Sequence, residues 1–292
     1  MFYHSKILLS FIIPTVNDPR IEETIVSVIK SIGWSPRDCE LIVIVNNCPK
    51  YFYEKLCNKF SSLRVKENVK ILYLKKTNIS QARNLGIKAS QGQYVVHIDS
   101  DCKLSLDYIE KLKKHLSMQK VIIGRGTIRF IPSDNLLSRA NCELKRTAYF
   151  TREEMVYTPN LIIKKEVYKK VGLFDEKLFH GEDTEWSERL KNLQIKPLFL
   201  NNLIIEHTDH KNIFKILLTY FYYGIGRAYR FKKYVFSNNP GLKKLNSFYL
   251  LFNAIPNLRA INSAIIKLII FFLYLVRDIG VIYGLFKWKK VE

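Results

Sequence analysis

The sequence has few cysteines and none in paired motifs. Its five cysteines are odd in number, and no two of them stand in a Cys-x-x-Cys spacing. A disulfide framework usually has an even set, and a zinc ribbon or knuckle needs closely spaced thiols, so the sequence argues against both classes. We expect free thiols, as in a reducing compartment.

Acidic residues are scarce, above all towards the C-terminus. The 292 residues include 47 Lys and Arg but only 26 Asp and Glu, a formal net charge of +21. Residues 211–292 hold 14 basic residues and two acids, Asp278 and Glu292. Nucleic acid would suit the charge alone, but the sequence shows no recognisable nucleic-acid module. The same segment is dense in Phe, Tyr, Ile and Leu, which favours an anionic membrane surface.

The N-terminal apolar run lacks a small-residue cleavage site after it. Ile7–Pro14 is about as long as a short signal core, but it leads directly into the polar loop Thr15–Asp18. This pattern indicates a buried strand that ends in a loop. We therefore expect no secretion signal. Together with the basic tail, this predicts a place at the cytoplasmic face of the plasma membrane.

Apolar strand-like runs alternate with amphipathic helical stretches over the first 125 residues. We expect strands at Ile7–Pro14, Glu40–Val45, Lys70–Leu74 and Tyr94–Ile98, and helices at Ile21–Ile32, Tyr51–Phe60 and Ser80–Ala89. Near-continuous Ile, Val and Leu runs separated by helices predict an α/β fold. Its Rossmann-like sheet would be mostly parallel and flanked by helices.

The second part of the chain is less regular. Strands are expected near Val121–Gly124, Asn160–Ile163 and Leu203–Glu206, and a helix from Glu182, with an irregular stretch after residue 124. Beyond His210 long apolar helical segments follow.

Polar clusters come directly after three of the predicted strands, at Thr15–Asp18, at Asn46 with Asn47, and at Asp99–Asp101. Ligands bind beyond the carboxyl ends of strands in open α/β sheets, so these clusters indicate one site. Asp99 and Asp101 can hold a hard divalent cation through oxygen, and that cation can bridge a diphosphate. An isolated Asp-x-Asp triplet more often only solvates a loop.

Three ordered blocks give this triplet a context. They are Phe11–Asn17, then Asn78–Gly86 leading through Ala89–Tyr94 to Asp99–Asp101, and finally Val171–Glu176 followed by Gly181–Trp186. In this order and spacing, residues 7–210 resemble the family 2 glycosyltransferases, inverting enzymes of the GT-A fold that include the bacterial surface-polysaccharide type. The resemblance implies a catalytic domain over residues 1–210 and a basic, apolar, helical tail over 211–292.

The resemblance also implies roles for single residues. Asp101 would bind the metal, Mg²⁺ or Mn²⁺, Asp99 would hold the metal or the donor ribose, and His207 would complete the metal site. Arg83 would lie near the donor phosphates. The donor-binding set would be Pro14, Thr15, Asn17, Asn46, Arg83, Asp99 and Ser100.

On the acceptor side the resemblance makes Asp183 the general base, with Glu182 and Trp186 binding the acceptor. A sugar hydroxyl is a poor nucleophile, so a carboxylate that removes its proton suits the chemistry. Glu182 and Asp183 could instead only complement the start of a helix.

Other assignments stay open as well. Arg83 could pair with a surface acid, and His207 could be a packed histidine or yield its role to His210. Asn46 and Asn47 stand where the family usually shows acids that read the base, which leaves the base open.

The tail segment Ile265–Phe286 approaches the ~20 apolar residues that span a bilayer. Arg277 and Asp278 interrupt it and are adjacent, so we do not expect them to pair along one helix face. We expect interfacial helices, whose lysines face lipid phosphates: Lys232, Lys233, Lys243, Lys244, Lys287, Lys289 and Lys290. The alternative is a helical subdomain packed on the enzyme or on a second subunit, which leaves a homo-oligomer open.

The sequence thus predicts a hexosyltransferase-type enzyme. It would move a sugar from a nucleoside-diphosphate donor to a saccharide or lipid-linked acceptor in cell-surface polysaccharide or glycolipid synthesis. The alternative is a non-catalytic nucleotide-sugar-binding or scaffold protein. A sugar-phosphate nucleotidyltransferase is disfavoured, because no glycine-rich phosphate loop stands near the N-terminus.

Overall fold

The computed structural model describes residues 7–33, 38–61, 68–235 and 261–288. The chain forms two compact units, each built from several segments. The first unit comprises Met1–Arg129, Val156–Glu176 and Lys196–His207, and the second comprises Phe130–Met155, Lys177–Ile195 and Thr208–Glu292. The functional boundary that we predict at residue 210 is a separate matter and stays a prediction.

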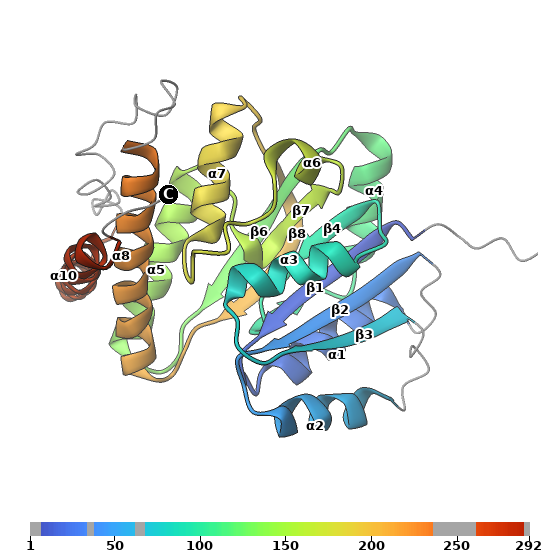
Figure 1. Ribbon diagram of the computed structural model, residues 1–292, viewed down its shortest axis with the longest axis horizontal. Coiled ribbons are helices and arrows are strands. Elements are labelled where there is room, and N and C mark those ends of the chain that lie inside the picture. Colours follow the sequence, from blue (N-terminus) through green and yellow to red (C-terminus); the bar gives the residue numbers. More distant parts are fainter. Residues whose placement is uncertain (1–6, 34–37, 62–67, 236–260, 289–292) are drawn as a thin grey trace, which may run out of the picture. The chain divides into compact units, whose positions relative to one another are not determined.

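The first unit is built on an eight-stranded sheet, in the order β3-β2-β1-β4-β7-β6-β8-β5 (Figure 1). Its strands are β1 (Leu9–Thr15), β2 (Cys39–Asn46), β3 (Val69–Leu74), β4 (Tyr94–His97), β5 (Cys102–Leu104), β6 (Ile123–Ile131), β7 (Leu161–Lys164) and β8 (Leu198–Thr208). Its helices are α1 (Ile21–Ile32), α2 (Lys50–Ser61), α3 (Ile79–Ala89), α4 (Tyr108–Met118) and α6 (Val167–Val171), with a 3-10 turn η2 (Thr158–Asn160).

The strands of the first half run parallel, and those of the second half pair differently. β3, β2, β1 and β4 form a parallel set. β7 pairs antiparallel with both β4 and β6, and β5 pairs antiparallel with β8. The α/β fold is confirmed, but a mostly parallel sheet is a correct description of the first half only. β8 has both exposed and buried positions, which an antiparallel strand tolerates.

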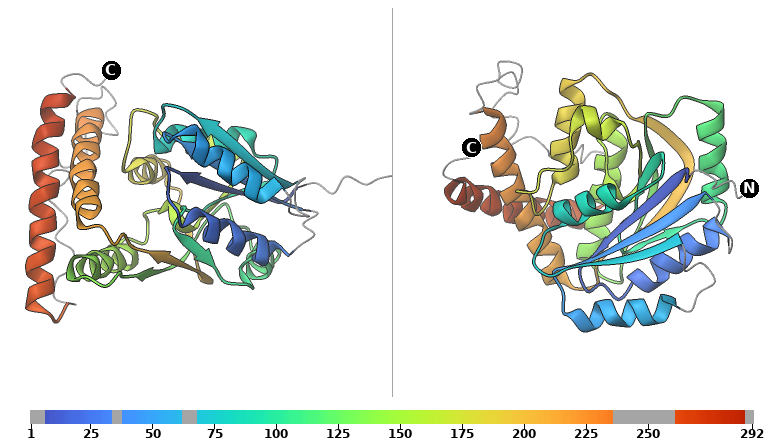
Figure 2. Two further views of the ribbon diagram at one scale, coloured as in Figure 1. Left: turned by 90° about the horizontal axis from the view of Figure 1, so that it is seen from below. Right: turned by 45° about the vertical axis from the view of Figure 1, so that its right-hand side comes forward.

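Two helices cover opposite faces of the parallel strands (Figures 1 and 2). Every residue of β1 and β2 is buried, as a central parallel sheet requires. α1 turns its apolar stripe inwards, with Ile25 and Val28 fully buried. α3 contacts β1 and β2 closely at Gly86, where an added Cβ would lie 2.5 Å from Ile12 Cγ2. The glycine therefore lets α3, which carries Arg83, lie directly on the sheet.

The predicted elements of the first 98 residues match the structure to within one or two residues at most ends. The stretch after residue 124, which we expected to be irregular, instead continues β6 to Ile131 and forms α5 (Leu136–Thr151). The side chain of Asn135 caps α5 by accepting a hydrogen bond from Ser138 N, a local signal that the expectation overlooked.

The second unit is helical among the described residues and contains α5, α7 (Glu182–Asn192), α8 (Ile213–Val235) and α10 (Ala264–Lys287). α8 and α10 pack against each other and cross at an angle (Figures 1 and 2). A buried cluster joins them to α5, with Ala140 from α5, Ile216 and Tyr220 from α8, and Ile270 and Leu273 from α10. Among the described residues no helix has the length and apolarity of a membrane-crossing segment.

Two expectations about the tail are wrong. Arg277 is buried and does pair with its neighbour, since its Nη2 lies 2.6 Å from Asp278 Oδ1 and its guanidinium carbon 4.3 Å from the Tyr274 ring centre. Lys232 donates to Leu285 O at 2.7 Å, and Lys233 pairs with a buried glutamate, so neither is a free lipid-facing cation.

Of the other lysines that we expected to face lipid, Lys287 is exposed. Lys243, Lys244, Lys289 and Lys290 lie outside the described residues. Membrane association of the tail stays a prediction.

Candidate active site

The parallel sheet opens between β1 and β4 at the ends of these strands. β1 pairs with β4 only as far as Ile12 and His97, whereas its pairing with β2 continues to Thr15. Pro14, which has no N–H to donate, therefore lies where β1 has left β4. The strand order reverses between these two strands, and such a switch point is where open α/β sheets bind ligands.

Arg83 and Asp99 form an ion pair beside this opening. Arg83 Nη2 donates to Asp99 Oδ1 at 2.7 Å, and the arginine side chain is only 3% exposed. α3 holds it through a reciprocal cap at its start, where Asn78 Oδ1 accepts from Gln81 N and Gln81 Oε1 accepts from Asn78 N. Arg83 thus pairs with the acid of the predicted site and not with a distant surface acid.

His97 and Tyr168 support this region from the interior. The hydroxyl oxygen of Tyr168 lies 2.7 Å from His97 Nε2, and both side chains are buried. Burial, and to a smaller extent the charge of Arg83, lower the pKa of His97 well below its usual value, so the imidazole is neutral at pH 7. A sequence pattern does not distinguish such a histidine from an exposed one.

Asp101 and His207 come together through the pairing of β5 with β8. Cys102 lies opposite His207 in that register, and His207 Nε2 is 3.4 Å from Asp101 Oδ1. The ligand atoms of Asp101, Cys102 and His207 all lie within 4.8 Å of one another. His210 is not a member of this group, and its carbonyl accepts from Ser133 Oγ at 3.1 Å. Of the two histidines, the geometry favours His207.

The residues gathered here fit a divalent cation. Carboxylate oxygen suits Mg²⁺ or Mn²⁺, and Asp99 offers a second carboxylate two residues away. Burial, with the nearby charges of Asp101 and Asp99, raises the pKa of the Cys102 thiol well above its usual value. The thiol therefore stays protonated and packs in the interior. The ligand roles themselves stay predictions.

Arg20 contacts the predicted metal residue Asp101 and was not among the residues predicted from sequence. Its guanidinium lies 2.7 Å from Asp18 Oδ2 and 3.2 Å from Asp101 Oδ2, so it bridges the loops after β1 and β4. Thr24 on α1 also donates to Ser100 O at 2.9 Å, which fixes the main chain of the Asp-Ser-Asp triplet. The parallel pairing of β1 with β4 places the loops that follow them next to each other, but the path of these loops decides which side chains meet.

Buried polar groups without partners lie at the ends of β1 and β2. Thr15 and Asn46 are each 1% exposed. Within the part of the chain that the structure describes, Thr15 Oγ1 and both amide atoms of Asn46 make no hydrogen bond. Asn17 and Asn47, just beyond, have φ values of 48° and 50°, a left-handed conformation that asparagine tolerates. Unpaired buried polar groups are unfavourable, which is consistent with a ligand that satisfies them.

The predicted acceptor-side residues lie at the start of α7, in the second unit. Gly181 precedes the helix at φ 80°, and Asp183 Oδ1 accepts from Thr184 N at 2.7 Å. Glu182 is 5% exposed and Trp186 fully buried, so both pack into the unit. The catalytic role of Asp183 and the acceptor roles of Glu182 and Trp186 stay predictions.

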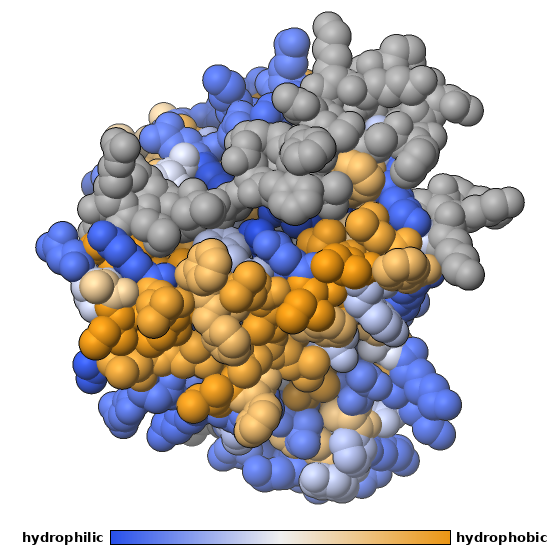
Figure 3. Space-filling view, turned by 90° about the vertical axis from the view of Figure 1, so that its left-hand side faces the viewer, coloured by the Kyte–Doolittle hydropathy of each residue, from blue (hydrophilic) through white to orange (hydrophobic). Residues whose placement is uncertain are grey.

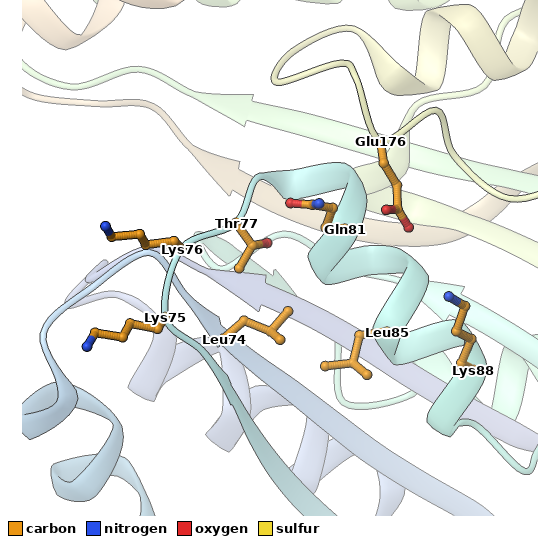
Figure 4. Close-up of a pocket in the computed structure, with 8 residues that line it drawn as sticks. All are labelled: Leu74, Lys75, Lys76, Thr77, Gln81, Leu85, Lys88 and Glu176. Atoms are coloured by element: carbon orange, nitrogen blue, oxygen red, sulfur yellow. The ribbon is translucent and has the colours of Figure 1, made fainter.

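A shallow pocket of about 260 Å³ lies where β3 ends and α3 begins (Figure 4). Leu74 and Leu85 line it, while Lys75 and Lys76 extend away from α3 (Figure 4). The remaining lining residues are Thr77, Gln81, Lys88 and Glu176. None of the predicted donor or metal residues lines this pocket, so we do not assign the donor to it.

Comparison with known proteins gives one consistent picture. The model of the family described as glycosyl transferase family 2 matches residues 10–172. Glycosyltransferase AglE of Haloferax volcanii is 23% identical, over 67% of this chain and 65% of its own length. The dTDP-rhamnosyl transferase RfbF of Shigella flexneri is 23% identical, over 59% of this chain and 60% of its own. The chain thus matches less than two thirds of each relative.

Two solved structures share the fold. The mannosyltransferase PcManGT of Pyrobaculum calidifontis, in complex with GDP-Man and Mn²⁺, superposes with a TM-score of 0.62 at 13% identity, covering 97% of this chain and 88% of its own. GalNAc-T7 with UDP, GalNAc and Mn²⁺ gives a TM-score of 0.56 at 18% identity, covering 81% and 52%. At these identities the likeness shows the GT-A fold, as the sequence predicted.

Proposed function

Because the chain belongs to glycosyl transferase family 2, we propose that it transfers a sugar from a nucleoside-diphosphate donor to an acceptor hydroxyl. The observation that carries this proposal is the polar site of the first unit. Asp101 and His207 meet there across two paired strands, and Arg83 binds Asp99 at 2.7 Å beside them.

The donor side follows from these contacts. Asp101 and His207, with Asp99, would hold Mg²⁺ or Mn²⁺, and that cation would neutralise the charge on the leaving diphosphate. Arg83 adds a guanidinium that can bind phosphate oxygen. The buried amide of Asn46 can donate one hydrogen bond and accept another, which fits the N3–H edge of a uracil or thymine base.

On the acceptor side Asp183 removes the proton of the attacking hydroxyl as the donor bond breaks. A carboxylate that acts as base in a single displacement inverts the anomeric carbon. Of the acids at the start of α7, Asp183 is the one that is not buried, so its carboxylate can accept a hydrogen bond from a saccharide hydroxyl. Inversion and the acceptor roles are part of the proposal.

The acceptor is proposed to be lipid-linked, in the synthesis of a cell-surface polysaccharide or glycolipid. Apolar side chains gather on one face of the molecule (Figure 3). Many come from α10, whose exposed apolar residues include Ile265, Leu268, Phe271, Phe272, Leu275, Ile279, Ile282 and Phe286. With the basic residues of 211–292, such a face supports docking on the cytoplasmic surface of the plasma membrane.

A donor screen tests the proposed reaction. The purified full chain is incubated with UDP, GDP and dTDP sugars, with and without Mn²⁺ or Mg²⁺, and release of the nucleoside diphosphate is followed. We expect metal-dependent turnover of one donor class, and Asp101→Asn should lower it by about a hundredfold, because charge stabilisation at the diphosphate is lost.

Glu206→Gln is the matched control, since Glu206 is an exposed acid adjacent to His207 on β8. It should leave turnover unchanged. Tight donor binding without release of nucleotide would contradict the proposal in favour of the non-catalytic alternative. Absence of both binding and turnover would contradict both.

A further inference from the structure

α8 contacts the residues directly before the predicted base. Arg230 Nη1 donates to Gly181 O at 3.2 Å, and Gly181 is the residue that precedes α7. An added Cβ on Gly181 would lie only 2.4 Å from that nitrogen, and the φ of 80° is itself unfavourable for other residues. The sequence therefore has glycine where the turn is left-handed and the guanidinium approaches most closely.

The same helix holds α7 at further points. Lys233 Nζ lies 2.8 Å from Glu185 Oε1, and the hydroxyl of Tyr234 donates to that oxygen at 3.0 Å. The Glu185 side chain is fully buried, so these are bonds of the interior and not of the surface. Gly226 lets the α8 backbone approach His180, since a Cβ there would lie 2.3 Å from the carbonyl of His180.

The charges of the two helices are complementary. α7 begins with the acids Glu182, Asp183 and Glu185, while α8 contributes Arg230 and Lys233. Burial lowers the pKa of Arg230, and the charges of Glu188 and then Asp183 act in the opposite direction. A partly buried cation is stabilised by such anionic partners, so Arg230 and the acids of α7 stabilise one another.

We propose that Arg230 is a positioning residue for transfer, which fixes the turn Gly181–Asp183 and provides the positive charge beside Asp183. This inference rests on the proposed function, in which Asp183 is the base. By this inference α8 supports the acceptor side of the reaction. The sequence, in contrast, predicts that the segment 211–292, which contains α8, is a membrane-associated tail.

The charge of Arg230 predicts a change in pH dependence. A nearby cation favours the ionised carboxylate, so its removal should raise the pKa of Asp183 and move the acidic limb of kcat/KM to higher pH. Other ionisable groups also interact with Arg230, among them Glu185 and Glu188 from α7 and Arg227 and Tyr234 from α8, and all of these remain in the variant. The change therefore reports on Arg230 itself.

Three variants of the full chain test the inference: Arg230→Met, Arg230→Lys and, as control, Lys232→Met. Lys232 lies two positions further along α8. Its ammonium also donates a hydrogen bond, but to Leu285 O on α10 and not to α7. Each variant is assayed for transfer to an acceptor, for hydrolysis of the donor without acceptor, for the pH profile and for thermal unfolding.

We expect Arg230→Met to lower kcat for transfer by about thirtyfold with donor hydrolysis and donor KM within about twofold of wild type. Its acidic limb should move up by about one pH unit, and Arg230→Lys, which keeps the charge, should restore the wild-type limb. Lys232→Met should leave the pH profile unchanged.

Equal losses of transfer and donor hydrolysis in Arg230→Met would overturn the inference, and so would an unshifted pH limb. If Arg230→Met does not fold, Arg230→Lys decides: it must lower kcat, because the shorter ammonium cannot span the same hydrogen bond, yet keep the acidic limb. Failure of the proposed function would be visible separately, as a wild-type chain that neither hydrolyses nor transfers any donor.

Discussion

At the scale of single residues, Asn46 has a polar side chain that the fold itself leaves unsatisfied. It is 1% exposed, and among the described residues neither amide atom makes a hydrogen bond. Asn46→Leu, of similar shape, should raise the free energy of unfolding without donor by about 1 kcal/mol, because an unpaired buried amide is removed. It should weaken donor binding about tenfold. Urea unfolding and calorimetric titration with the nucleotide measure the two effects.

Asn141 gives the matched control for this prediction. It is also buried, but its amide donates to Asp209 at 2.9 Å and accepts from Tyr220 at 2.8 Å. Asn141→Leu should therefore lower the free energy of unfolding by about 1–3 kcal/mol, the opposite sign. If both variants destabilise equally, the amide of Asn46 has partners in the free protein and the donor role loses its support.

The family motifs predicted from sequence that Asp101 and His207 lie at one site, and the strand register brings these two side chains together, while their ligand roles stay predictions. Asp99 and Asp101 follow a buried strand, and the β5–β8 pairing then places His207 beside them. The sequence could not indicate Arg20, whose contact with Asp101 depends on the path of a loop. It also misjudged Arg277, because adjacent side chains on a helix can still meet when one of them is long.

At the scale of elements, α8 and α10 approach so closely that glycines at their contact leave no room for a side chain. A Cβ on Gly280 would lie 2.1 Å from Phe221 O, and one on Gly224 would lie 2.0 Å from Arg277 O. Gly280→Ala should therefore lower the free energy of unfolding by about 1–3 kcal/mol, because the helices must separate to accommodate the methyl group. Urea unfolding followed by circular dichroism measures this change.

Ile279→Ala is the comparison variant, because it also places an alanine on α10, but at an exposed position. Ile279 is 59% exposed, so its truncation should change the free energy of unfolding by less than about 0.5 kcal/mol. A Gly280→Ala variant as stable as Ile279→Ala would show that the two helices do not cross closely in solution.

The parallel half of the sheet was predictable, since α1 carries a clear apolar stripe and β1 and β2 are near-continuous apolar runs. The antiparallel half was harder to predict. β6 and β8 extend well past the apolar segments at Val121–Gly124 and Leu203–Glu206, and their extra residues are partly exposed. Periodicity reports burial, so it identifies only the buried part of such strands.

At the scale of the whole molecule, the sequence predicted the GT-A fold and the family, because the matching motifs lie mainly within residues 10–172. It was less informative about the second unit. Phe130–Met155 and Lys177–Ile195 belong to a unit with Thr208–Glu292, although they are distant along the chain. Such grouping depends on helix packing between remote segments, which one sequence without a clear motif does not specify.

The apolar face of α10 leads to a prediction about where the protein resides. Leu268 and Phe271 are 69% and 55% exposed, and the segment 211–292 carries 14 basic residues. The chain should therefore sediment with phosphatidylglycerol vesicles at low salt, more weakly at high salt, and least with phosphatidylcholine alone, since charge attraction is screened while apolar insertion is not. Leu268→Glu and Phe271→Glu should each reduce vesicle binding about fivefold. Leu106→Glu, at a 74% exposed position of the first unit, should leave vesicle binding unchanged.

If a second copy of the chain covers this face instead, sedimentation velocity will show a dimer without lipid, and Leu268→Glu will convert it to a monomer. In that case a protein partner, and not an anionic bilayer, accounts for the exposed apolar surface.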